Sequence, residues 1–173
     1  MVMVSWGIAV FLAWLFLSAG WHKLRSPSAF SAVLAQYLAA ASDRQWLVYP
    51  LAISEFLLAV LLLLPATQVA GAMLASAFLA LYAGVMTWQL AKGRRDVRCG
   101  CAGPASEVTV SPSLIIRNLM CAAAALVLVV PAPWVTMSTA PVGLVAFVGG
   151  FLVVLYLCSD QLIANSQKMA GSR

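Results

Sequence analysis

The sequence predicts an all-α integral membrane protein, a bundle of four to five transmembrane helices with one amphipathic helix at the membrane surface. Hydrophobic residues make up 64% of the 173 residues, charged residues make up 9%, and the mean hydropathy is +0.99. A chain of this length and composition cannot bury its apolar side chains inside a water-soluble globule. Instead, five stretches come close to the roughly 20 apolar residues that a helix needs to cross a bilayer.

The five predicted spans cover residues 4–21, 46–64, 69–90, 113–130 and 141–158. The first span lacks a basic segment before it and stays apolar for a full membrane crossing, which favours a retained helix over a cleaved secretory signal. No internal repeat, soluble domain or long linker interrupts the pattern. Residues 1–173 are therefore predicted to form a single bundle domain.

The segment 26–41, between the first two spans, is too short and too interrupted by Ser and Pro to cross the membrane. Ser26-Pro27 is typical of a helix start. Apolar side chains follow at helical spacing, at Ala29, Phe30, Val33, Leu34, Tyr37 and Leu38. This pattern predicts an amphipathic helix that lies along the membrane surface.

Positive charges gather in two of the loops and at the C-terminus. They are Lys23, Arg25 and Arg44 after the first span, Lys92, Arg94, Arg95 and Arg98 after the third, Arg117 early in the fourth, and Lys168 and Arg173 after the fifth. The connections 65–68 and 131–140 carry no charge. Because short cytoplasmic loops retain Lys and Arg, we expect the N-terminus on the outer side of the membrane and the C-terminus and both charged loops on the cytoplasmic side.

The net charge of +5 is explained by this topology and by attraction to anionic lipid. The lipid bilayer is thus an expected partner, and nucleic acid is not.

Two cysteines one residue apart, Cys99 and Cys101, lie in the charged loop 92–104 among four cations. Neighbouring cations favour the thiolate, which is the form that exchanges disulfides or binds soft metals. A disulfide between residues so close in sequence closes a small ring that cannot easily reach the preferred torsion, so it is readily reduced. The pair predicts redox or metal chemistry at a bilayer surface.

Metal binding is the alternative chemistry for this pair. Cys99 and Cys101 supply only half of the four ligands of a structural zinc site. Cu(I) accepts fewer soft ligands, and Met73, Met86 and Met120 are available. These methionines do not follow a repeated ligand spacing, so thiol redox chemistry is preferred over a copper site.

Glu55 lies about nine residues into the second span, which puts it about 14 Å deep and close to the bilayer midplane. A carboxyl group there must pair, take up a proton or face a polar cavity, which makes it a candidate functional residue. The alternative is a protonated Glu55 that hydrogen-bonds a neighbouring helix for packing. Arg117, on the fourth span, is the predicted charged partner of Glu55.

His22 and Lys23 close the first span. They are either interfacial anchors or, on the same membrane side as the Cys loop, a proton carrier and a thiolate stabiliser. Cys121 and Cys158 are expected to serve packing, as buried membrane cysteines usually do. The small residues at positions 18–20 predict the close approach of another helix.

Several short motifs resemble the MauE family of methylamine utilisation membrane proteins and its DoxX-like relatives. They are Ala19-Gly20-Trp21-His22-Lys23-Leu24, Ser28-Ala29-Phe30, Tyr49-Pro50-Leu51-Ala52-Ile53-Ser54-Glu55, Cys99-Gly100-Cys101-Ala102-Gly103 and Ile116-Arg117-Asn118. They occur in the family's order over about residues 18–120. Ala102 departs from the family pattern, which more often has a bulky residue there. The resemblance implies a helical inner-membrane protein required for maturation of methylamine dehydrogenase, especially its disulfide-rich small subunit.

Our working hypothesis is a thiol–disulfide redox protein in which Cys99 and Cys101 alternate between dithiol and disulfide. Arg98 would stabilise the thiolate. The expected partners are a thioredoxin-like protein and a maturing secreted protein, with a membrane quinone as candidate terminal acceptor. The alternatives are a non-enzymatic assembly factor, a Cu(I)-binding or transport protein, and a quinone reductase without thiol chemistry.

In this hypothesis, Glu55 and His22 move protons and Arg117 holds Glu55. The family role implies chemistry in the periplasm, whereas the charge pattern places Cys99 and Cys101 at the cytoplasmic face. Either electrons pass through the bundle by a thiol such as Cys121, or this protein breaks the charge rule.

Overall fold

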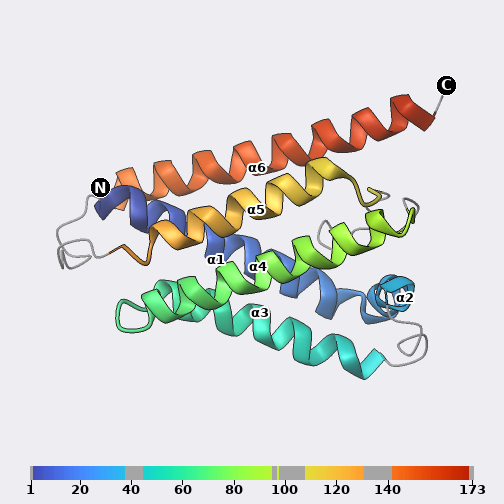
Figure 1. Cartoon of the computed structure of the whole chain (residues 1–173). Coiled ribbons are helices and arrows are strands. Elements are labelled where there is room, and N and C mark those ends of the chain that lie inside the picture. The colour runs from blue at the N-terminus through green and yellow to red at the C-terminus, as the bar shows by residue number, and fades with distance from the viewer. Residues whose placement is uncertain (1, 38–44, 95–96, 98–107, 131–141, 172–173) are drawn as a thin grey trace.

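The computed structural model describes residues 2–37, 45–94, 97, 108–130 and 142–171, and helices dominate this part of the chain (Figure 1). The elements are α1 (Val2–Arg25), α2 (Pro27–Tyr37), the short 3-10 helix η2 (Gln45–Leu47), α3 (Val48–Leu63), α4 (Gln68–Ala91), α5 (Pro112–Val127) and α6 (Val142–Gly171). The predicted all-α membrane class is confirmed.

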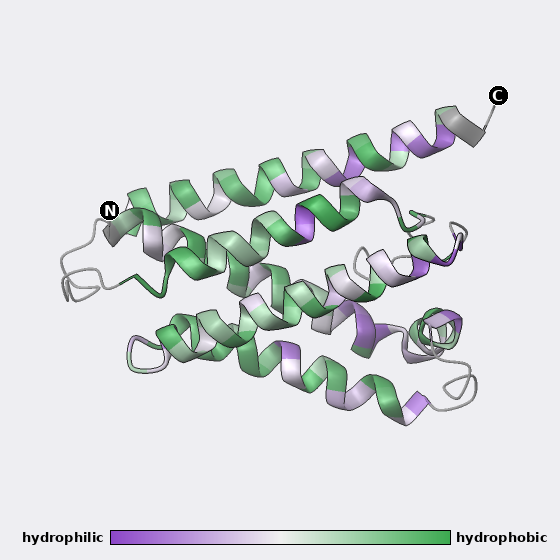
Figure 2. Cartoon of the chain, viewed as in Figure 1, coloured by the Kyte–Doolittle hydropathy of each residue, from purple (hydrophilic) through white to green (hydrophobic). Residues whose placement is uncertain are grey.

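The long helices run side by side with alternating direction, and α2 lies across one end of the bundle (Figure 1). Helix α1 packs against α3, α5 and α6, and α4 packs against α3 and α5. Figure 2 shows hydrophilic residues gathered where α1, α4 and α6 end. We call this the charged end of the bundle. The opposite end holds the start of α1 and the turn between α3 and α4.

In the described part of the chain, four helical segments are long and apolar enough to cross a bilayer, namely Met3–Arg25, Gln45–Leu63, Gln68–Ala91 and Val142–Met169. Helix α5 has 16 residues, which corresponds to about 24 Å, less than the roughly 30 Å hydrocarbon core. The structure is thus consistent with the four to five spans expected. Helix α6 continues well past the predicted end at residue 158, because a helix need not stop where its sequence turns polar.

Glycines allow α1 to approach its neighbours closely. A Cβ atom on Gly7 would overlap the side chain of Val148 in α6. A Cβ on Gly20 would lie 3.2 Å from the backbone oxygen of Ala52 and 3.0 Å from the Phe56 ring, both in α3. Helix pairs in membranes gain most of their stability from such close packing, and the prediction from the small residues at 18–20 is confirmed.

The core of the bundle is built around α1, which contributes more buried apolar side chains to it than any other described helix. They are Trp6, Ala9, Phe11, Leu12, Ala13, Leu15 and Phe16. Helix α6 differs, since large apolar side chains such as Phe147, Phe151 and Leu162 are more than half exposed. In a membrane protein this face contacts lipid, and the opposite face of α6 packs mainly against α1.

Candidate functional site

A buried ion pair joins α1 to α3 near the charged end of the bundle. Lys23 Nζ lies 2.6 Å from Oε1 and 2.8 Å from Oε2 of Glu55, and it donates hydrogen bonds to both. The side chains are 1% and 0% exposed, respectively. Lys23 occupies the last turn of α1 and Glu55 the middle of the second span, so the packing of these two helices brings the charges together.

Three further groups complete this cluster. The Tyr82 hydroxyl of α4 donates a hydrogen bond to Glu55 Oε1 at 3.0 Å. Lys23 Nζ donates its third hydrogen bond to the backbone oxygen of Ala19, at 3.4 Å, and lies 4.8 Å from the centre of the Phe30 ring in α2. The ammonium is therefore held by three acceptors and covered by an aromatic face.

The Lys23–Glu55–Tyr82 cluster has the chemistry of a proton-handling site. Either charge alone would be very costly inside a bilayer, and the pair persists because each charge compensates the other. The cluster joins an amine and a phenol to one carboxylate by hydrogen bonds. Of the three alternatives expected for Glu55, namely pairing, protonation or a polar cavity, the structure shows pairing, and the partner is Lys23.

The predicted pairing of Glu55 with Arg117 is wrong. Arg117 lies in α5 and donates a hydrogen bond from Nη1 to Asp160 Oδ1 of α6, at 2.5 Å. Its guanidinium carbon also lies 4.4 Å from the centre of the Tyr156 ring. Asp160 follows the predicted end of the last span, so it was not considered as a partner. The continuation of α6 as a helix is what brings Asp160 beside α5.

His22 is exposed, whereas its neighbour Lys23 is buried. Successive residues of a helix point about 100° apart, so adjacency in sequence does not place the two side chains together. The structure therefore does not bring His22 into the Lys23–Glu55–Tyr82 cluster. His22 lies at the charged end, where a side chain can exchange protons with water.

Cys99, Cys101 and Arg98 lie outside the described residues. The structure does describe the two chain segments that flank them. The Val110 amide donates a hydrogen bond to the Val97 oxygen at 2.8 Å, and both side chains are buried. We call Val97 and residues 108–110 the loop base.

The loop base is tied to the bundle at several points. Thr109 exchanges two hydrogen bonds with Gln167 of α6, one from the Thr109 amide at 3.0 Å and one from Gln167 Nε2 to the Thr109 oxygen at 2.9 Å. Its valines form a small apolar core with Met86 and Leu114.

Tyr37 of α2 also packs against this small core. Helix α2 therefore contacts the loop base through Tyr37 and the buried Lys23 through Phe30. The two segments that flank the Cys-Gly-Cys sequence are thus held against the bundle at the charged end. They lie next to α2, the helix that also covers Lys23.

The cysteines in the described part of the chain are both free thiols. Cys121 is buried in the main core, as the packing interpretation expects, and Cys158 is exposed. Of the candidate copper ligands, Met86 is buried at the loop base, while Met73 and Met120 are more than half exposed. Within the described ranges, no group of three His, Cys, Asp or Glu side chains could hold a metal ion.

Sequence comparison relates the chain to one group of proteins. Residues 1–131 match the family described as methylamine utilisation protein MauE. A relative named methylamine utilization protein MauE, from Paracoccus denitrificans, is 30% identical over 166 residues, which cover 94% of this chain and 88% of the relative. No solved structure matches the chain significantly. The family match includes Lys23, Glu55 and Tyr82 but ends before Asp160.

Proposed function

Since the chain belongs to the MauE family of methylamine utilisation proteins, we propose that it supports disulfide formation in a secreted partner protein from the bacterial inner membrane. By resemblance to the family, the partner is the small subunit of methylamine dehydrogenase. The redox pair is Cys99 and Cys101, separated by one glycine.

The proposed step is thiol–disulfide exchange. A thiolate of the partner attacks one sulfur of the Cys99–Cys101 disulfide and forms a mixed disulfide, which the partner's second thiolate then resolves. The partner gains one disulfide, and Cys99 and Cys101 become two thiols that take up the two protons lost by the partner. Arg98, adjacent to Cys99, stabilises the thiolate that leaves.

The reduced pair must then pass two electrons and two protons to an acceptor. A thioredoxin-like protein in its disulfide form accepts them by a second exchange reaction. A membrane quinone accepts the same two electrons and two protons and becomes a quinol. Either acceptor leaves Cys99 and Cys101 ready for another cycle.

The observation that carries the proposal is the buried Lys23–Glu55–Tyr82 cluster at the end of the bundle where the loop base is fixed. Thiol oxidation and reduction move protons as well as electrons. In the proposal Glu55 stores a proton, Lys23 balances its charge, and the exposed His22 exchanges protons with water.

Arg117 has a different role from the one expected of it. With Asp160 and Tyr156 it holds α5 against α6, and thereby fixes the helix that follows the loop base. The charge pattern favours a cytoplasmic loop and a periplasmic N-terminus. In that orientation the partner's thiolates cannot attack the loop directly, so the two electrons pass from the periplasmic partner through the bundle to the Cys99–Cys101 disulfide, and Cys121 is the buried thiol available for a relay.

The test replaces Cys99→Ser and Cys101→Ser together, and measures the disulfide content of the secreted partner by alkylation and mass spectrometry. We expect the partner's disulfides to be lost in this variant. The matched control is Cys158→Ser, which removes an exposed free thiol of α6 and should leave them intact. Fully formed partner disulfides in the double variant would refute the redox role. Stoichiometric copper in the purified protein would instead favour the Cu(I) alternative.

A second test separates proton handling from packing. Glu55→Gln keeps the side-chain shape and removes the titratable group, so partner oxidation should slow by about 10²-fold, in the range of general acid–base effects. Because Glu55→Gln leaves Lys23 buried without a counter-charge, Lys23→Met with Glu55→Gln is the stable comparison. An unchanged rate in both variants would show that the cluster is purely structural.

A further inference from the structure

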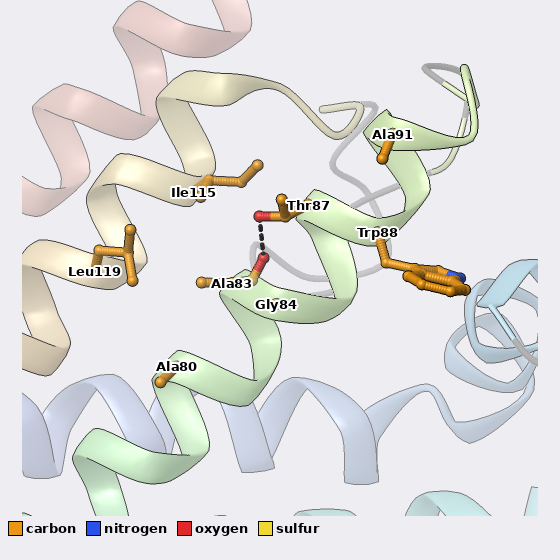
Figure 3. A pocket seen from close by; sticks show the side chains of 8 residues that line it. All are labelled: Ala80, Ala83, Gly84, Thr87, Trp88, Ala91, Ile115 and Leu119. Carbon is orange, nitrogen blue, oxygen red and sulfur yellow. Dashed lines mark hydrogen bonds between the residues drawn. The ribbon is translucent and has the colours of Figure 1, made fainter.

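An apolar groove of about 400 Å³ lies between α4 and α5 (Figure 3). Its lining residues are Ala80, Ala83, Gly84, Thr87, Trp88, Ala91, Ile115 and Leu119. None of these residues belongs to the Lys23–Glu55–Tyr82 cluster, and although Ile115 packs against the small core at the loop base, the proposed function does not explain the groove.

Small side chains on α4 create this groove. Ala80 and Gly84 lie one turn apart on the same helix face, and a Cβ atom on Gly84 would have no neighbour within 4 Å. The hydroxyl of Thr87 donates a hydrogen bond to the Ala83 oxygen of its own helix at 2.8 Å. The groove therefore has an apolar wall that suits a hydrocarbon chain.

The mouth of the groove is positively charged. Trp88 lines it and is 62% exposed, and Lys92 Nζ lies 4.7 Å from the centre of the Trp88 ring. Arg94 follows Lys92 by two residues and donates a hydrogen bond from Nη1 to Gln89 Oε1 at 3.3 Å. The tryptophan and the two cations lie at the charged end, where lipid headgroups are expected.

No carboxylate in the described part of the chain neutralises Lys92 or Arg94. The acidic side chains described there are Glu55, which pairs with Lys23, and Asp160, which pairs with Arg117. Among the described residues, then, no carboxylate offsets the positive charge of Lys92 and Arg94.

We propose that the groove binds one acyl chain of an anionic phospholipid whose headgroup lies against Lys92 and Arg94. The tail cannot provide selectivity, because the surrounding lipid is as apolar as the groove. Selectivity comes from the headgroup charge, and each basic residue near the surface strengthens the binding of an anionic lipid by about fivefold.

The test measures lipid retained by the purified full-length protein, by native mass spectrometry after incubation with phosphatidylglycerol or phosphatidylcholine of identical acyl chains. We expect phosphatidylglycerol to be retained preferentially. Lys92→Gln should reduce that preference by about fivefold. The matched control is Lys168→Gln, which removes an exposed charge at the same end outside the groove and should leave the preference unchanged.

A second pair of variants tests the groove itself. Gly84→Leu fills the cavity and should abolish retention of the lipid. Gly150→Leu adds the same side chain at an equally open position on α6 and should not. Equal retention of both lipids, or retention that survives Gly84→Leu, would overturn the proposal. A dimer that disappears only in Gly84→Leu would also overturn it, because the groove would then hold a second copy of the chain.

Discussion

Lys23 and Glu55 stabilise the bundle only as a pair. Both side chains are almost fully buried, and the ammonium makes two of its three hydrogen bonds to this one carboxylate. In an apolar environment the attraction between the two charges offsets the loss of hydration, and neither residue has another charged partner among the described residues.

Replacing one residue of the Lys23–Glu55 pair should therefore lower the free energy of unfolding more than replacing both. We expect Lys23→Met to lower the free energy of unfolding by about 3–5 kcal/mol, because it leaves a buried carboxylate uncompensated. Lys23→Met combined with Glu55→Gln should recover much of this loss, since the remaining amide can still accept the Tyr82 hydrogen bond. Unfolding of the purified protein in detergent measures both effects. Lys168→Met, at an exposed position, is the control.

Equal losses in the single and double variants would contradict this pairing. The stability of the single variant would then reflect side-chain packing rather than charge, and the two residues would show no coupling energy in a double-mutant cycle.

At Arg117 we expect the planar shape of the side chain, and not only its charge, to stabilise the protein. Arg117→Lys keeps the positive charge beside Asp160 but loses the planar group that stacks on Tyr156. We expect a loss of about 1–2 kcal/mol in unfolding free energy, which is typical of a desolvated cation–π contact. Arg94→Lys, at an exposed position, should cost almost nothing. Equal effects at the two positions would show that stacking on Tyr156 is not stabilising.

These residue pairs mark where sequence reasoning reaches its limit. Depth within a span identifies Glu55 as a buried carboxylate, because hydropathy alone gives that depth. Its partner depends on how two helices are rotated and staggered against each other, which spacing along one helix does not determine. The sequence therefore predicts an interfacial anchor or a thiolate stabiliser at Lys23, whereas the structure pairs Lys23 with Glu55.

At the scale of the elements, glycine residues decide where two helices can pack closely. Gly7 in α1 faces Val148 in α6, and Gly149 faces Val10 at 3.1 Å from an added Cβ. Two glycines on facing helices let the backbones approach closely, so that van der Waals contact replaces the missing side chains.

Gly7→Ala should therefore separate α1 from α6. Its Cβ would overlap a β-branched side chain that has little freedom to move. We expect a loss of about 1–3 kcal/mol in unfolding free energy, as for overpacked cores. Gly150→Ala is the matched control, because its Cβ would meet nothing within 4 Å and alanine favours helix. A stabilised Gly7→Ala variant would mean that the two helices do not meet there.

The sequence predicts the ends of a helix well where the apolar stretch and the helix end at the same residues. The spans that became α3 and α4 match their helices closely, because a turn with Pro65 separates them. Helix α6 was predicted to end at Cys158 but continues to Gly171, since hydropathy reports the part of a helix in lipid and not its last turn. The amphipathic pattern after Ser26 correctly predicts helix α2. The structure describes this helix as far as Tyr37.

At the scale of the whole molecule, charge is distributed along the bundle axis. Lys23, Lys92 and Lys168 all lie at the charged end, as do the loop base and α2, whereas the turn between α3 and α4 carries no charge. This asymmetry links topology to the proposed function, because Val97 and residues 108–110, which flank the segment with Cys99 and Cys101 in the sequence, lie at the charged end.

The orientation can be measured with single reporter cysteines in a protein whose four cysteines are replaced by serine. Ala66→Cys places a thiol in the exposed turn between α3 and α4, and Ser166→Cys places one at an exposed position near the end of α6. We expect a membrane-impermeant maleimide to label residue 66 in spheroplasts and residue 166 only in inverted vesicles, because Lys and Arg favour the cytoplasm.

Labelling of both positions from one side would contradict the bundle, since α3, α4 and α6 place them at opposite ends. The reverse pattern, with residue 166 labelled in spheroplasts, would leave the bundle intact and overturn the orientation. Cys99 and Cys101 would then reach secreted partners directly, and the relay through Cys121 would be unnecessary. With the expected pattern, oxidising equivalents must cross the bilayer, and Cys121→Ser should then abolish partner oxidation while the Cys99 and Cys101 thiols remain present.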